Sequence, residues 1–385
     1  MIKLTLKHRR TLPAGCIKGQ AGLSLIELMI AIALGLVLTL GVIQIYLSGS
    51  ASYRQTQGLA HAQESTRFVS AMLAPDFRSA GTFGCLARMG RPLNQVVDNR
   101  LNGVLTVPVN QALQGWEYSG TGPGDNITLA AAIDTPVAGS WASGSAGTNL
   151  PAALAGSVIT NSDVIIVNAL TPLGVPVNGG NPQNGANINL TGASGVDDRI
   201  ILTVDEACSR GELFQNTNNR NATALTIAGG NVNPGNNGNT FNVDYGDDDG
   251  DPLTTPRVYE FTAMAYYIGE GTNDEPALFR RLMTPLSSAP QELVSGVETL
   301  QLLYGVDTGG TSAADNYVPA NQVTDWESIV SVRFSTMTRS QDEVLTEANN
   351  RSFDMLGSEV SQANNGDRRA RLVSVGTTAL RGIMQ

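Results

Sequence analysis

The chain has 385 residues, a hydrophobic fraction of 42% and a formal net charge of −10. Its 34 carboxylates outnumber its 24 basic side chains, which disfavours a duplex-DNA-binding surface, because such surfaces gather lysine and arginine. It has two histidines, His8 and His61. A histidine-based metal site or a Ser-His-Asp hydrolase site therefore cannot be assembled from the sequence after His61, and no cofactor is expected.

An almost uninterrupted apolar run extends from residue 23 to residue 47, after a short basic segment. About 25 residues at ~1.5 Å each would cross the hydrocarbon core of a bilayer as one helix. Glu27 is the one charged residue in the run. A carboxylate at that depth costs about a few kcal/mol unless a partner neutralises it, so Glu27 is a candidate functional residue.

Cleavage after Gly22 would provide a partner that neutralises this carboxylate. It would expose an α-amino group on Leu23, one helical turn from Glu27, and the amine of one subunit could then pair with Glu27 of its neighbour. An ordinary signal peptide or single-pass anchor is the alternative, and the basic segment suits both. A secretory signal, however, has a shorter apolar core that precedes its cleavage site, whereas here the candidate site precedes a longer run.

The arrangement resembles the N-terminus of a type IV prepilin. In that family a basic leader ends in glycine, here Gly22, and a prepilin peptidase cleaves there and N-methylates the next residue, here Leu23. The glutamate at the fifth position of the mature chain corresponds to Glu27. The usual residue at the Leu23 position is phenylalanine, and this mild departure leaves the predicted cleavage unchanged.

Three parts are predicted: a cleaved leader at 1–22, a helix at 23–80 and a head at 81–385. Within the helix, residues 23–47 are expected to span the membrane and residues 48–80 to be amphipathic. The cationic leader predicts that the leader lies inside and the head outside, which for a bacterial-type prepilin means the periplasm. Without the leader, 19 arginines and no lysine face 34 carboxylates, which gives a net charge near −15.

Cysteine usage fits an oxidising compartment. Cys16 would leave with the leader, so that Cys85 and Cys208 remain. A disulfide between them would close a loop of about 123 residues, which the chain-entropy model values at roughly 4 to 5 kcal/mol. The alternative is two separately buried thiols, because spacing in the sequence does not give their separation in space.

The sequence after Cys85 predicts a mainly antiparallel β head, and with the long helix an α+β fold. Short runs rich in Val, Ile, Thr and Tyr alternate there with Gly, Asn and Pro. Polar stretches at 176–195 and 216–250 are longer than usual hairpin loops, and we expect them to be either mobile or a recognition surface. The expected strands lie at 127–132, 163–169, 199–204, 257–268, 277–283, 297–306, 329–338 and 371–380.

The acidic run at 247–251 suggests a Ca²⁺ loop. Aligning Gly250 with the glycine of an EF-hand, however, places Tyr245 at the first ligand position and Pro256 at the last. The EF-hand motif therefore fails. Either a cation site of another kind or, more simply, a solvated acidic turn is expected there.

Segments along the whole chain resemble PilW, a family of minor pilins of type IV pili. Where that family often has an Asp-rich turn, this chain reads DTGGTSAADN from Asp307, which weakens the case for a cation loop there. The similar segments are LAPDFRSAGTFGC at 73–85, SDVIIVN at 162–168, DEACSRGELFQ at 205–215, QELVSGVETLQLLYGVD at 291–307, DWESIVSVRFSTMTRS at 325–340 and RRARLVSVGTTALR at 368–381.

The resemblance implies a structural, non-catalytic subunit that joins other minor pilins, the major pilin and a tip adhesin to prime pilus assembly. It also implies processing by the prepilin peptidase, contact with an inner-membrane assembly platform, and a single-pass location in the inner membrane before the pilus tip. Twitching motility, cell adhesion and DNA uptake are the outputs of such fibres. Neither a small-molecule substrate nor direct contact with nucleic acid is expected.

Two alternatives remain open at this point. A minor pseudopilin of a type II secretion system shares the leader and the helix but serves protein export. A membrane-tethered adhesin or DNA-uptake component belongs to another class, and it would keep its function without Glu27, whereas an assembly subunit would not.

Overall fold

The structure is a computed structural model. The chain divides into two units, residues 1–53 and residues 54–385. Residues 1–21, Leu23 and the acidic run at 247–251 lie outside the described residues. The residues described are 22, 24–86, 93–103, 105, 107–130, 133, 138–178, 184–229, 233–246, 255–284, 288–363 and 366–381.

The helix α1 (Leu25–Ser79) has two parts that differ in burial. The large apolar side chains from Leu25 to Leu47 are exposed, and among the described helices α1 alone has a stretch long and apolar enough to cross a membrane. Beyond residue 54, by contrast, a set of apolar side chains at helical spacing is fully buried against the head. These are Ala62, Val69, Leu73 and Phe77.

The buried part of α1 contacts both large sheets of the head. Phe77 packs edge to face against Tyr266, with ring centroids 5.9 Å apart, and against Phe334, with centroids 5.7 Å apart. Gly58 is a close-packing point, because a Cβ at that position would lie 2.8 Å from Val344 Cγ1. The helix passes Pro75 and ends at Ser79, so the proline falls in the last turn, where little helix remains to be broken.

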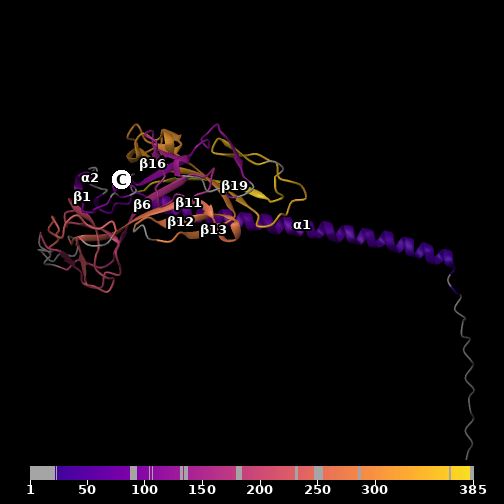
Figure 1. Ribbon diagram of the computed structural model, residues 1–385, viewed down its shortest axis with the longest axis horizontal. Coiled ribbons are helices and arrows are strands. Elements are labelled where there is room, and N and C mark those ends of the chain that lie inside the picture. The colour runs from indigo at the N-terminus through magenta and orange to yellow at the C-terminus, as the bar shows by residue number, and fades with distance from the viewer. Residues whose placement is uncertain are drawn as a thin grey trace, which may run out of the picture. The chain divides into compact units, whose positions relative to one another are not determined.

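The described strands of the head form four sheets, and their strand pairs are mostly antiparallel. In the largest, the order is β1-β9-β8-β11-β6-β2-β4-β5, with β12 paired to β11 and β13 paired to β12. Figure 1 shows β6, β11, β12 and β13 side by side. The bounds are β1 (Val97–Asn99), β2 (Leu113–Tyr118), β4 (Trp141–Ser143), β5 (Thr148–Asn149), β6 (Val164–Pro172), β8 (Ile200–Val204), β9 (Gly211–Gln215), β11 (Arg257–Glu270), β12 (Pro276–Leu282) and β13 (Gln291–Ser295).

Three smaller sheets and several short helices complete the head. The order in the four-stranded sheet is β15-β14-β16-β19, and β17-β18-β3 and β10-β7 form the other two. Among the described strands, β1 with β9 and β18 with β3 are the parallel pairs. The remaining elements are α2 (Leu93–Val96), β3 (Asn126–Leu129), η2 (Ala138–Ser140), β7 (Asn187–Asn189), β10 (Ala224–Thr226), η3 (Thr272–Asp274), β14 (Val297–Val306), β15 (Asn316–Val318), η4 (Ala320–Gln322), η5 (Trp326–Ser328), β16 (Ile329–Arg339), β17 (Phe353–Met355), β18 (Ser358–Gln362) and β19 (Arg371–Ala379).

This architecture confirms the predicted fold class, a long apolar N-terminal helix followed by a mostly antiparallel β head. Each of the eight expected strands corresponds to a strand of the structure, with ends that differ by a few residues. The strands that were not expected are mostly short, and β2, β9 and β13 are the longest of those in the ten-stranded sheet.

The described parts of the two Asn/Gly-rich stretches pack around a small core of their own. It includes Ile188, Leu225 and Phe241, which are nearly fully buried. Asn236 also lies inside, where its Oδ1 accepts the backbone N–H of Gln215 (2.7 Å) and its Nδ2 donates to the Gln215 carbonyl (2.8 Å). A buried amide side chain thus takes the place of a neighbouring strand. The described parts of these stretches are thus packed, and the expectation that the stretches are either mobile or a recognition surface stays a prediction.

Candidate functional site

Ser24 sets the first turn of α1. The Glu27 backbone N–H donates to Ser24 Oγ (3.2 Å), and the Leu28 N–H donates to the Ser24 carbonyl (3.1 Å). Serine at this position followed three residues later by glutamate is the capping-box pattern. The helix therefore begins at a defined residue, and Glu27 lies in its first turn.

Gly22 and Glu27 are exposed, and among the described residues no heavy atom beyond Gly22 itself and its chain neighbours lies within 4 Å of the position that a Cβ on Gly22 would take. The apolar side chains that follow Glu27 are exposed as well, and the Thr39 hydroxyl among them donates to the Gly35 carbonyl (2.7 Å). A hydroxyl that bonds its own helix can lie in an apolar environment at small cost. Except for Glu27, the segment therefore suits burial among lipids or other helices.

Cys85 and Cys208 form a disulfide, with their Cα atoms 5.9 Å apart. The bond ties the segment after α1 to the turn between β8 and β9. That turn is ordered by Asp205, whose Oδ1 accepts the Ser209 N–H (2.7 Å) and whose carbonyl accepts the Cys208 N–H (3.0 Å). The disulfide thus fixes the end of the helix to one side of the ten-stranded sheet.

Loss of this disulfide is expected to destabilise the head. For a loop of 123 residues, the chain-entropy model gives roughly 4 to 5 kcal/mol. A Cys85→Ser variant should therefore unfold at a lower temperature, and reduced wild type should unfold at about the temperature of the variant. The measurement is thermal unfolding of the detergent-solubilised full chain with and without dithiothreitol. A melting temperature of the wild type that does not respond to reduction would contradict the prediction.

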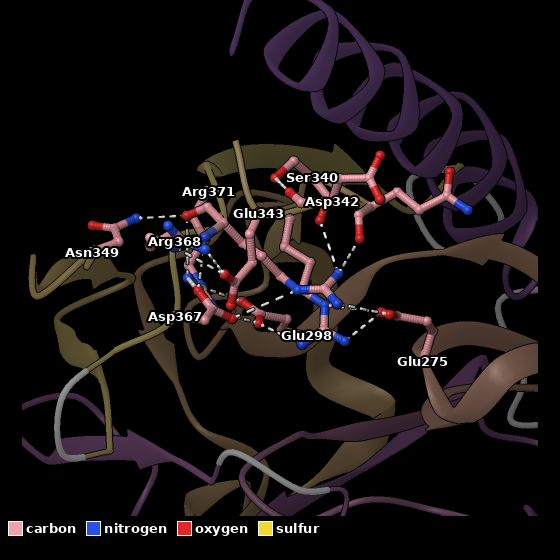
Figure 2. Close-up of polar contacts among 12 residues, drawn as sticks. Glu275, Glu298, Ser340, Asp342, Glu343, Asn349, Asp367, Arg368 and Arg371 are labelled. Atoms are coloured by element: carbon pink, nitrogen blue, oxygen red, sulfur yellow. Dashed lines mark hydrogen bonds and ion pairs between the residues drawn. The ribbon is translucent and has the colours of Figure 1, made fainter. Parts of the chain in front are cut away.

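A cluster of alternating charges crosses the C-terminal part of the head (Figure 2). Arg371 on β19, whose side chain is fully buried, forms a bidentate pair with Glu298, with Nε to Oε2 at 2.7 Å and Nη2 to Oε1 at 2.8 Å. Arg339 on β16 joins Glu298 (3.2 Å) to Glu275 before β12, and Asp367 accepts from Arg371. The cluster therefore cross-links β14, β16 and β19 to the start of β12.

Partial burial of Asp367 opposes its ionisation, but hydrogen bonds from Arg371 and from the Arg369 backbone outweigh it and hold the pKa of Asp367 below its usual range. A carboxyl whose pKa is lower in the folded state stabilises the fold above its unfolded pKa of about 3.9. This contribution is lost as the pH falls through the folded value. The contribution of Asp367 to the cluster should thus be lost only at a pH below the usual carboxyl range.

Removal of Arg371 is expected to cost far more than removal of an exposed arginine. An Arg371→Ala variant leaves Glu298 buried without its main partner, and breaking one side of a buried pair costs roughly 3 to 5 kcal/mol. The matched control is Arg220→Ala, because Arg220 pairs with Asp197 at 3.0 Å on the surface, where such pairs contribute about 1 kcal/mol or less. Chemical denaturation of the two variants measures the difference, and equal losses would refute the assignment.

The turn after β14 uses its carboxylates to order its own backbone. Asp315 Oδ2 accepts from the backbone N–H (2.8 Å) and the hydroxyl of Thr308, and these bonds lower the pKa of Asp315. Asp307 accepts the N–H groups of Gly309 (3.1 Å) and Ser312 (2.7 Å). Within the described residues, no group of three or more His, Cys, Asp or Glu side chains is arranged to hold a metal ion.

Comparison with known proteins bears on both ends of the chain. Residues 265–382 match the family described as type IV pilus-assembly protein W, and residues 17–43 match the prokaryotic N-terminal methylation motif. Both ends of the chain are thus similar to type IV pilin-like proteins, and we call residues 265–382 the PilW region. The PilW region extends from within β11 past the end of β19 and contains the whole charged cluster around Arg371.

Among solved structures, the chain is similar to a type IV-like pilin from Thermus thermophilus, at 13% sequence identity. The match covers 36% of this chain and 73% of the other, with a TM-score of 0.20, and at that score it supports no further conclusion. No curated protein sequence matches the chain. The family that residues 265–382 match is not known as catalytic. The N-terminal methylation motif implies processing by a prepilin peptidase, anchoring in a membrane and contact with other pilus components.

Proposed function

We propose that this pilin-like protein is a minor pilin that primes assembly of a type IV pilus as part of a tip or initiation complex. The observation that carries the proposal is the start of α1, where a capped first turn holds one exposed carboxylate, Glu27, at the head of an apolar segment whose large side chains are exposed. Such a helix needs either lipid or other helices around it, and its carboxylate needs a cation.

Cleavage after Gly22 would supply that cation. A prepilin peptidase would release residues 1–22 and methylate Leu23, which leaves a positively charged N-terminus within reach of a neighbouring subunit. Glu27 of one subunit would then pair with the methylated amine of the next. The pairing neutralises both charges only in the assembled helix bundle, so the mechanism is templating and not catalysis.

In this proposal the processed chain waits in the inner membrane as a single-pass protein with a periplasmic head. The assembly platform then moves it into the base of a growing fibre together with other minor pilins, the major pilin and a tip adhesin. The match of residues 265–382 to a pilus-assembly family supports a minor rather than a bulk subunit. Among the described strands, β13 and β15 lie at sheet edges, and such edges could pair with partner heads.

Chemical cross-linking in intact cells, followed by purification of the protein, tests the choice of assembly. We expect cross-links to pilins and to pilus-assembly components, and enrichment of the protein at the ends of sheared fibres. Recovery of secretion-system subunits in place of pilins would contradict the proposal and indicate a pseudopilin. A protein with neither kind of partner would indicate a monomeric tethered adhesin.

A further inference from the structure

Two carboxylates outside the PilW region are buried where the ten-stranded and four-stranded sheets meet. Glu117 lies near the end of β2 and is 3% exposed, and Asp163 directly precedes β6 and is 1% exposed. Carboxylates are rarely buried so deeply without a cationic partner. Yet among the described residues, no ion pair involves either of them.

Asp163 bonds to both sheets at once. Its Oδ1 accepts the backbone N–H of Tyr118 at the end of β2 (3.2 Å), and its Oδ2 accepts the backbone N–H of Leu302 in the middle of β14 (2.8 Å). The Asp163 backbone N–H donates to the Leu300 carbonyl (2.8 Å). Asp163 thus joins a strand of the ten-stranded sheet to a strand of the four-stranded sheet through three hydrogen bonds.

Glu117 is less well satisfied. Its Oε1 accepts the Thr121 hydroxyl (3.3 Å), and the backbone of Ala320 in η4 also bonds to the carboxyl. Its Oε2, however, is buried and has no hydrogen-bond partner in the described part of the chain. Burying an ionised oxygen without a hydrogen-bond partner costs much more free energy than burying a protonated carboxyl.

The groups that face the pair from other elements do not neutralise it. Asp125, in the turn after β2, adds negative charge, and Tyr304 on β14 is a fully buried phenol whose pKa is raised by burial and by the two carboxylates. Trp326 of η5 packs edge to face on the Tyr304 ring, with centroids 5.0 Å apart. Trp141 on β4 is buried, with its ring centroid 5.1 Å from that of Tyr118, and Glu327 of η5 is exposed and accepts from Asn110.

Burial is the main cause of the shifts, with a smaller effect of one carboxylate on the other. It raises the pKa of Asp163 to about 7, even though the Leu302 and Tyr118 amides oppose the change, and it raises the pKa of Glu117 well above its usual range. A group whose folded pKa is raised contributes stability that is complete below its unfolded pKa of about 4 and is lost as pH rises through the folded value.

We propose that Glu117 and Asp163 are buried as neutral, protonated carboxyls and form a pH-sensitive contact between the two large sheets of the head. Below neutral pH both carboxyls keep their protons and remain buried, and the bonds from Asp163 to β2 and β14 hold the sheets together. In mildly alkaline solution the carboxyls begin to lose their protons, and negative charge then develops at the junction, where no ion pair among the described residues neutralises it. The junction between β2 and β14 weakens, while the rest of each sheet keeps its pairing. A head exposed to the medium would thereby respond to external pH.

The test compares Glu117→Gln with wild type, using the detergent-solubilised full chain at pH 5.5 and pH 8.5. The substitution keeps an acceptor for Thr121 and places a neutral NH₂ where Oε2 has no partner. We expect the wild type to melt at a lower temperature at pH 8.5 than at pH 5.5, and the variant to lose most of that difference by gaining stability at pH 8.5. A variant that is destabilised equally at both pH values would overturn the proposal.

A matched control and a local measurement make the result specific. Glu212 is also fully buried, but it pairs with Arg100 at 3.7 Å, so Glu212→Gln should lower stability without flattening the pH dependence. Hydrogen exchange, corrected for its intrinsic pH dependence, should show faster exchange of the Tyr118 and Leu302 amides at pH 8.5 in wild type but not in Glu117→Gln. Unchanged protection of both amides in wild type at pH 8.5 would also overturn the proposal.

Discussion

A Glu27→Ala variant is expected to be cleaved and to stay in the membrane, yet to be absent from pili. The substitution removes the one charge of the apolar segment and leaves the backbone N–H that donates to Ser24 Oγ, so the helix start should be intact. A more apolar segment is also held at least as well by lipid. What the variant lacks is the counter-charge for a neighbouring N-terminus, and assembly should fall to the level of a strain without the protein.

The measurement is immunodetection of the protein in sheared fibres and in the membrane fraction. Glu64→Ala is the matched control, because Glu64 is an exposed glutamate of the same helix outside the apolar segment, and this variant should assemble like wild type. Normal incorporation of Glu27→Ala into pili would show that Glu27 is not needed for assembly, and it would favour a tethered protein that acts alone.

A Gly22→Val variant is expected to abolish function at an earlier step. The peptidase must bring the peptide bond after Gly22 into its active site, and a branched side chain there would obstruct that approach. The uncleaved chain would keep its cationic leader and would present no free amine on Leu23. We therefore expect a longer protein in the membrane fraction and none in pili.

Mobility on a denaturing gel, together with the sheared-fibre assay, measures this outcome. Gly49→Val is the matched control, because nothing lies within 4 Å of a Cβ at that position and valine is a slightly better helix former than glycine. Cleavage of Gly22→Val at the normal position would show that the glycine does not direct processing.

Prediction of the fold from the sequence worked where a strand is long and rich in β-branched residues. Strands β11, β14 and β16 each have ten or more residues, and their ends were placed within a few residues. The missed strands lack that signal. Strand β9 reads GELFQ, and its glutamate, Glu212, is tolerated in a buried position because Arg100, the Val243 N–H and other donors surround it. Those partners come from distant parts of the chain.

The residues of the candidate sites differ in the same way: some have a local signal in the sequence, and others do not. Gly22 and Glu27 could be predicted as site residues because their meaning depends on spacing along the chain, and the roles of both stay predictions. The S-x-x-E spacing from Ser24 was an equally local signal of the helix cap that was missed. Arg371 and Glu298 are far apart in sequence and meet only after β14, β16 and β19 have paired. Glu117 and Asp163 are likewise brought together only by folding. Their burial without an ion pair among the described residues could not be seen in the sequence.

The central claim, a processed and methylated pilin, is tested most directly by intact-mass spectrometry of the wild-type protein extracted from membranes. We predict a mass that begins at Leu23, carries one additional methyl group, and is two hydrogens below the fully reduced value because Cys85 and Cys208 are joined. A mass that still includes residues 1–22 would contradict the account.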